Sequence, residues 1–181
     1  MLEEKKKLIL SLMMKEIDYS IFIDDYNNLF DGLDVCRDLK IARNLKDSDA
    51  VDLFLYLGTV VSYKYSCVNL LNNLIIDTWH TKHEEFARLL SIYKDNTSVD
   101  YLYKASLLNL EYLEYDEDHV LADKCIRALA KINSAESIEK LDILSKSKNK
   151  SISKSANKQL KRIKVFKNNC SDSFGVKPPL Y

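Results

Sequence analysis

Residues 120–163 read VLADKCIRALAKINSAESIEKLDILSKSKNKSISKSANKQLKRI, and this stretch decides the fold. Its apolar residues recur every three or four positions, which is the spacing of an amphipathic helix. The segments 120–132 and 151–163 share a pattern in which a small residue, Cys125 or Ala156, stands one turn before a leucine and an isoleucine closes the stripe. Between them, Ser134 begins a Ser-Ala-Glu-Ser-Ile-Glu run that is typical of a helix N-cap. The stretch therefore predicts three successive helices, the third opening at Ser151 or Ser153.

The same spacing continues toward the N-terminus. It predicts further helices near 2–17, 18–32, 33–45, 82–94 and 99–113. Between residues 50 and 80 we expect a short and a longer helix, separated at Gly58-Thr59. Within the second of these, Val60–Val68 also alternates like a strand, so the pattern leaves helix and strand open there.

Glycine and proline are scarce, with three and two copies in the chain. An all-β fold of this size needs many tight turns, and those turns favour glycine, proline or asparagine-glycine. We therefore predict an all-α fold of stacked antiparallel helix pairs. It forms a single helical-repeat domain over residues 1–166, and residues 167–181 form an irregular tail.

The repeated pattern in 120–163 resembles a HEAT-type repeat, although the chain lacks the prolines that such repeats often carry. The resemblance implies a right-handed α-solenoid of about 8–10 helices, in which small residues let neighbouring helices approach closely. In such proteins the stacked helices offer an extended surface for binding another macromolecule.

Composition narrows the possible partners and the compartment. Basic and acidic residues balance at 27 each, so no global field favours nucleic acid or a membrane surface. The four cysteines are not spaced for a metal site; they are Cys36, Cys67, Cys125 and Cys170. The first three fall in apolar segments, which indicates reduced, buried thiols. With no signal-peptide pattern at the N-terminus, we expect a cytoplasmic protein.

Catalytic motifs are missing from the sequence. It has no Gly-x-Ser-x-Gly elbow and no glycine-rich phosphate loop, so we expect a non-enzymatic protein without metal or cofactor. The nearest approach to a reactive cluster is Asp77, His80, His83 and Glu84, whose helical spacing would suit a metal or an acid–base pair. The alternative is a helix junction with solvated histidines beside Trp79, which we favour.

Charge is instead segregated along the chain. Residues 95–118 hold seven acidic residues against the single Lys104, with four interleaved tyrosines. Tyrosines beside carboxylates suit recognition of a basic protein, because the rings fill pockets and the acids pair with Lys or Arg. The predicted contact residues, called here the acidic tyrosine surface, are Tyr101, Tyr103, Glu111, Tyr112, Glu114, Tyr115, Asp116, Glu117 and Asp118. The alternative is a solvated charged face with half-buried rings.

The opposite charge follows in residues 146–167, which contain nine Lys or Arg and no acid. This basic stretch could contact phosphates, and HEAT-like folds occur in certain DNA glycosylases, so a nucleic-acid-binding or glycosylase-like protein is our alternative. The favoured interpretation is the polar outer side of a terminal solenoid helix. The chain ends Pro178-Pro179-Leu180-Tyr181, which is similar to a Pro-Pro-x-Tyr ligand of WW domains.

The helices, the composition and the acidic tyrosine surface together make the chain look like small bacterial toxin-immunity proteins. The resemblance implies a protein that binds and blocks a cognate toxin with a basic, nuclease-type surface. The acidic tyrosine surface would then cover the toxin's active site. A general scaffold or adaptor is a further alternative.

Overall fold

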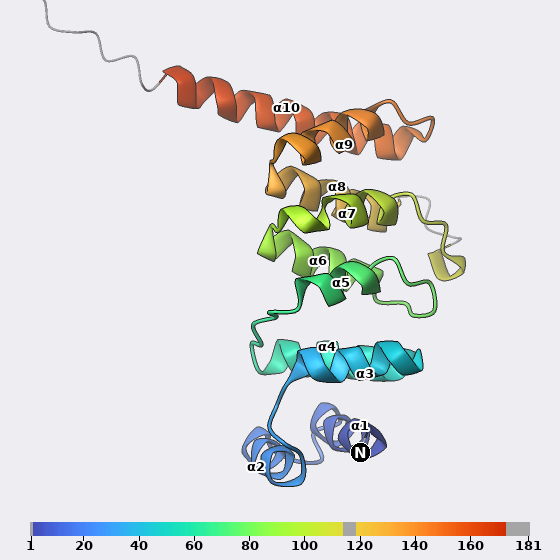
Figure 1. Ribbon diagram of the computed structural model, residues 1–181, viewed down its shortest axis with the longest axis vertical. Helices are drawn as coiled ribbons and strands as arrows, with labels where there is room; N and C mark the ends of the chain where they lie inside the picture. The colour runs from blue at the N-terminus through green and yellow to red at the C-terminus, as the bar shows by residue number, and fades with distance from the viewer. Residues whose placement is uncertain (1, 114–118, 173–181) are drawn as a thin grey trace, which may run out of the picture. The chain divides into compact units, whose positions relative to one another are not determined.

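The computed structural model describes residues 2–113 and 119–172, and within these ranges the chain is helical with no β-strand (Figure 1). This confirms the all-α prediction. No helix in the described ranges is both long and apolar enough to cross a membrane. The chain divides into two compact units, where we predicted one domain: the first runs to Leu70 and includes Asp77–Lys82, and the second holds Leu71–Ile76 and the chain from His83 onward.

Four helices belong to the first unit: α1 Leu2–Met13, α2 Tyr19–Leu29, α3 Val35–Leu45 and α4 Ser48–Val60. Side-chain caps start two of them. The carboxylate of Asp34 accepts a hydrogen bond from the Arg37 backbone N–H at 3.0 Å, and that of Asp47 accepts one from Ala50 at 2.9 Å. Each cap satisfies a backbone donor that a helix N-terminus leaves without a partner.

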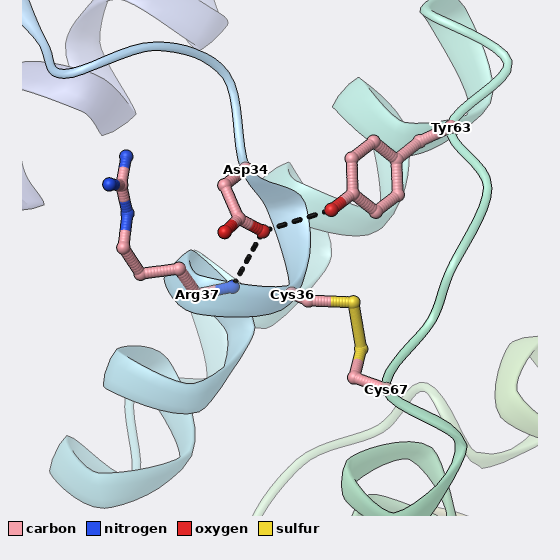
Figure 2. The surroundings of a disulfide bond; sticks show 5 residues. All are labelled: Asp34, Cys36, Arg37, Tyr63 and Cys67. Atoms are coloured by element: carbon pink, nitrogen blue, oxygen red, sulfur yellow. Dashed lines mark hydrogen bonds between the residues drawn. A yellow bond between two sulfur atoms is a disulfide. The ribbon is translucent and has the colours of Figure 1, made fainter.

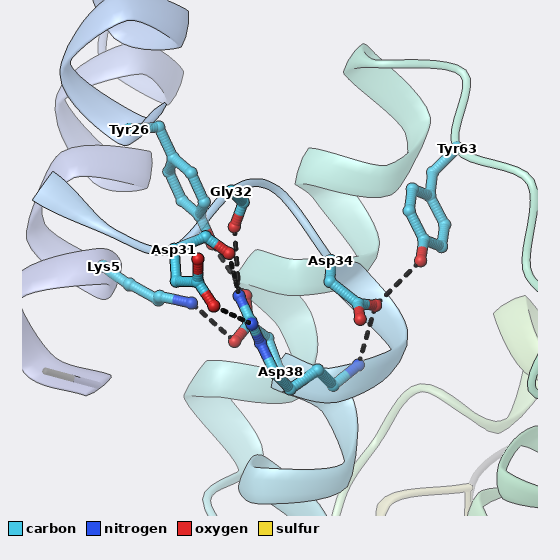
Figure 3. Close-up of polar contacts among 8 residues, drawn as sticks. Lys5, Tyr26, Asp31, Gly32, Asp34, Asp38 and Tyr63 are labelled. Carbon is cyan, nitrogen blue, oxygen red and sulfur yellow. Dashed lines mark hydrogen bonds and ion pairs between the residues drawn. The ribbon is translucent and has the colours of Figure 1, made fainter. Parts of the chain in front are cut away.

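A buried polar cluster joins three helices of the first unit (Figure 3). The Lys5 ammonium of α1 lies 2.7 Å from one carboxylate oxygen of Asp38, and the Tyr26 hydroxyl donates to the other at 2.7 Å. Lys5 and Asp38 are 4% and 1% exposed, so the ion pair is shielded from water. The same ammonium lies 5.3 Å and 5.2 Å from the ring centroids of Tyr26 and Phe30. Burial and the neighbouring Asp38 raise the pKa of Tyr26, so its hydroxyl stays a donor.

The cysteine prediction is wrong for two of the residues, because Cys36 and Cys67 form a disulfide with a Cα–Cα distance of 6.0 Å (Figure 2). It ties the first turn of α3 to the loop after α4. Beside it, the Tyr63 hydroxyl donates to Asp34 at 2.9 Å, so the loop is held to the same helix start twice. Cys125 is a free, buried thiol, as we predicted.

The segment 60–68 is neither of the two structures that the sequence left open. The helix α4 continues through Gly58 and Thr59 to Val60, residues 61–67 form a loop, and the next helix begins at Val68. Gly58 is therefore not a break. A Cβ at this position would collide with the hydroxyl of Tyr65, which is 4% exposed, so glycine is required by a close packing contact.

The second unit contains the remaining helices: α5 Val68–Leu74, which starts in the first unit, α6 His83–Tyr93, η1 Asn96–Ser98, α7 Val99–Ala105, η2 Glu111–Leu113, α8 Val120–Ile132, α9 Ala135–Ser145 and α10 Lys150–Asp172. Helix α8 is central, packing against α6, α7, α9 and α10. Its stripe of Leu121, Cys125, Ala128 and Leu129 is almost fully buried.

Three helix ends in the second unit differ from the sequence prediction. Helix α7 stops at Ala105 instead of residue 113, because the Ser106 hydroxyl donates to the Tyr103 carbonyl at 2.7 Å and occupies the acceptor that a further turn would use. Helix α10 is capped by Asn149, whose side chain accepts from Ser151 N–H at 2.9 Å. It also continues to Asp172, six residues beyond the predicted domain boundary at 166. Ser134 caps α9 as predicted.

Candidate functional site

The described part of the acidic tyrosine surface comes from two elements of the second unit. Tyr101 and Tyr103 lie on α7, and Glu111 and Tyr112 lie on η2. Tyr101 and Tyr103 are partly exposed, and Glu111 and Tyr112 are exposed. The other five predicted members lie outside the described residues; they are Glu114, Tyr115, Asp116, Glu117 and Asp118.

Two lysines from the chain itself already bind to this surface. The Lys140 ammonium of α9 lies 5.0 Å from the Tyr103 ring centroid and 2.7 Å from a carboxylate oxygen of Asp100. The hydrogen bond from Lys140 lowers the pKa of Asp100. Lys104 lies 5.8 Å from the Tyr101 ring centroid. The surface is therefore less acidic than the sequence indicated, because the fold adds Lys140 from a segment 36 positions beyond Lys104.

Tyr112 is held by a histidine. Its ring stacks on His83, with the ring centroids 5.7 Å apart, and its hydroxyl lies 2.8 Å from His83 Nδ1. The ring is exposed at one edge but partly buried against His83, and this partial burial, with Glu84 adding a smaller contribution, raises the pKa of Tyr112 to about 12. At neutral pH the hydroxyl is therefore protonated and can donate a hydrogen bond, to His83 or to a ligand at the exposed edge of the ring.

The four residues that we considered as a reactive cluster each have a partner elsewhere. Asp77 accepts from Arg43 Nε at 2.6 Å, and Glu84 lies 2.5 Å from the Lys124 ammonium. His80 Nδ1 accepts the backbone N–H of Lys82 at 3.1 Å. Within the described residues, no group of three or more His, Cys, Asp or Glu side chains could hold a metal ion. The interpretation that we favoured, a helix junction with solvated histidines, is wrong about the solvation, because His80 and His83 are 1% and 0% exposed.

A groove that the sequence did not predict lies between α6, α8 and α10 and encloses about 530 Å³. We call it the basic groove. Its lining contains five cations and no carboxylate: Arg88 of α6, Lys124, Arg127 and Lys131 of α8, and Arg162 of α10. Such a lining selects an anionic ligand, because an anion gains favourable interactions that a cation or a neutral group would not.

Part of the signal for this groove was present in the sequence. Lys124, Arg127 and Lys131 are spaced three and four residues apart, so they share one face of a helix. We singled out the basic stretch 146–167 instead, and of its nine Lys and Arg residues only Arg162 lines the groove. The contribution of Arg88 could not be read from the sequence, because it depends on α6 packing against α8.

No known protein family, curated protein or solved structure matches this chain.

Proposed function

We propose that the chain is a non-catalytic binding protein whose acidic tyrosine surface takes a partner protein with a basic surface. The single observation that supports this is the way Lys104 and Lys140 are placed over the Tyr101 and Tyr103 rings. Aromatic rings flanked by carboxylates attract ammonium groups. A partner's lysines or arginines would use the same chemistry at the exposed Glu111 and Tyr112 of η2.

The surface would be carried by a short α-solenoid of the HEAT type. In the second unit, α8 packs against both α9 and α10, and α7 packs against both α8 and α9. Contact with the next helix and with the one after it is the pattern that stacked helix pairs produce. This arrangement would leave the outer sides of α7 and η2 free for a partner.

The more specific form of the proposal is an immunity-type protein that blocks a toxin with a basic surface. Binding of opposite charges would make association fast and sensitive to salt. The Cys36–Cys67 disulfide bears on where this happens. Because structural disulfides persist mainly in oxidising compartments, it favours such a compartment over the cytoplasm that we expected.

The test uses the product of the reading frame next to that of this chain, purified and titrated against the full chain by calorimetry. We expect binding that weakens as salt is raised. The triple variant Glu111→Lys, Glu114→Lys and Asp116→Lys should weaken binding by about tenfold or more, since opposed charges at an interface become like charges.

The matched control is Asp24→Lys, which changes an exposed carboxylate of α2. It also reverses an acidic charge, but on the first unit, and should leave affinity unchanged. Equal affinity of the triple variant and the wild type would remove the acidic tyrosine surface as the contact site. Absence of binding would argue against the immunity form of the proposal.

A further inference from the structure

The basic groove is built by side chains from three helices that pack in one unit. Lys124, Arg127 and Lys131 line it from one face of α8, which packs against both α6 and α10. The Lys131 ammonium reaches across to α6, where it lies 3.4 Å from the Ser91 hydroxyl oxygen. The groove is therefore a product of the tertiary fold and not a row of lysines along one exposed helix.

Three of the five cations have a carboxylate partner outside the groove lining. Arg88 pairs with Glu85, Lys124 with Glu84 and Arg127 with Asp123, with N–O distances of 2.5, 2.5 and 2.6 Å. These pairs fix the side chains at the rim and reduce their net charge.

The remaining two cations, Lys131 and Arg162, have no carboxylate partner among the residues whose side chains are described. Two positive charges without a carboxylate partner among the described side chains therefore line one hollow. An anion bound there could pair with both of them. The pair Lys131 and Arg162 thus marks the position of the anionic group.

A glutamine adds hydrogen-bonding capacity at the same place. Gln159 of α10 lines the groove and is 6% exposed. Its amide NH₂ has two donors, so it can donate to an oxygen of a ligand bound in the groove.

Part of the groove lining, called here its floor, is formed by apolar side chains, two of which are short. Ala87, Ala130 and Ile163 line it, and the two alanines leave room above the helices. The volume of about 530 Å³ is in the range of small-molecule sites and is far larger than a single phosphate ion requires. The complementary ligand therefore has an anionic group at the cations and a flat apolar body on the floor.

We infer that the basic groove binds a nucleotide, with its phosphate between Lys131 and Arg162 and its base against Ala87, Ala130 and Ile163. Phosphate is favoured over carboxylate because the planar guanidinium of Arg162 can donate two parallel hydrogen bonds while other phosphate oxygens accept from Lys131 and Gln159. The nucleotide is either free or one unit of a single-stranded nucleic acid. This site is separate from the acidic tyrosine surface and does not depend on the function proposed for that surface.

The test measures binding of a fluorescein-labelled ten-residue oligothymidylate to the full chain by anisotropy, with unlabelled AMP, ATP and inorganic phosphate as competitors. The double variant Lys131→Ala and Arg162→Ala should lose about tenfold or more in affinity, because two charge-assisted hydrogen bonds are removed. The variant Gln159→Leu, which keeps the volume but removes the amide, should lose about threefold to tenfold.

The matched control is Lys161→Ala with Lys164→Ala, which removes two exposed charges of α10 that do not line the groove. Its affinity should stay within about twofold of the wild type, since neither side chain lines the groove and charges away from the ligand are screened at physiological salt. Circular dichroism of each variant establishes that it is folded.

The competitors separate the two sources of the nucleotide. Displacement of the oligonucleotide by AMP or ATP at submillimolar concentration identifies a free nucleotide as ligand, and binding of the oligonucleotide without such displacement identifies the polymer. Three results would overturn the inference. They are no binding of any probe, equal losses in the groove and control variants, and competition by inorganic phosphate as strong as that by AMP.

Discussion

The first unit buries one pair of charged side chains, the ion pair of Lys5 and Asp38, whereas the charged side chains of the basic groove and the acidic tyrosine surface lie at the surface of the second unit. The first unit also has the disulfide. In the second unit, the central helix α8 is held by an apolar stripe that includes Cys125 and Leu129. One buried ion pair thus stabilises the fold of the first unit, while the charges at the two candidate surfaces of the second unit can contact ligands.

Among the variants that test this difference, Asp38→Ala should change the free energy of unfolding the most. It would leave Lys5 buried and unpaired and would take the acceptor from Tyr26, lowering the free energy of unfolding of the first unit by about 3–5 kcal/mol. Trp79 is the single tryptophan and lies in the first unit, so its fluorescence during urea unfolding follows that unit.

Two controls sharpen the result. Asp24→Ala removes an exposed carboxylate of α2 and should be close to neutral. Replacing both partners, with Lys5→Met and Asp38→Leu, should cost less than Asp38→Ala alone, because no charge is left buried. Wild-type stability of Asp38→Ala would mean that the ion pair does not hold α1 to α3.

The disulfide should give the next largest effect. It closes a loop with a sequence separation of 31, and Cys36→Ser with Cys67→Ser should lower the free energy of unfolding by about 2–4 kcal/mol, mainly because the unfolded chain gains freedom. Thermal unfolding with and without dithiothreitol measures this. The reductant should shift the midpoint of the wild type and leave that of the double variant unchanged; an equal shift in both would contradict the assignment.

The smallest effect on stability is expected from the groove variant Lys131→Ala with Arg162→Ala. Both side chains are exposed and have no carboxylate partner among the described side chains, so the free energy of unfolding should change by no more than about 0.5 kcal/mol. Urea unfolding followed by far-ultraviolet dichroism measures it. A loss of unfolding free energy as large as that of Asp38→Ala would contradict the claim that these two charges do not stabilise the fold.

The sequence was sufficient where local rules decide the structure. Apolar spacing located α8, and Ser134 located the start of α9. It failed where a distant contact decides: Gly58 leaves space for the Tyr65 ring and does not break the helix, although the sequence alone suggested a break. The disulfide was missed because spacing along the chain does not reveal a Cα–Cα distance of 6.0 Å.

The two candidate surfaces show the same limit. The sequence placed Tyr101 and Tyr103 among acids, but Lys140 reaches them only through the packing of α7 and α9. The basic groove needs side chains from three helices, of which only the α8 face has a spacing that sequence inspection can find. What the sequence predicts for segments outside the described residues, including the Pro178–Tyr181 motif, stays a prediction.

The central claim is that the ligand-binding site lies in the second unit. A nuclear magnetic resonance titration of the isotope-labelled chain with AMP tests it most directly. We expect the backbone amide signals of Ala87, Lys131 and Gln159 to move in a saturable way while those of Lys5, Asp38 and Cys36 stay in place. Signals that move only in the first unit, or nowhere at millimolar AMP, would contradict it.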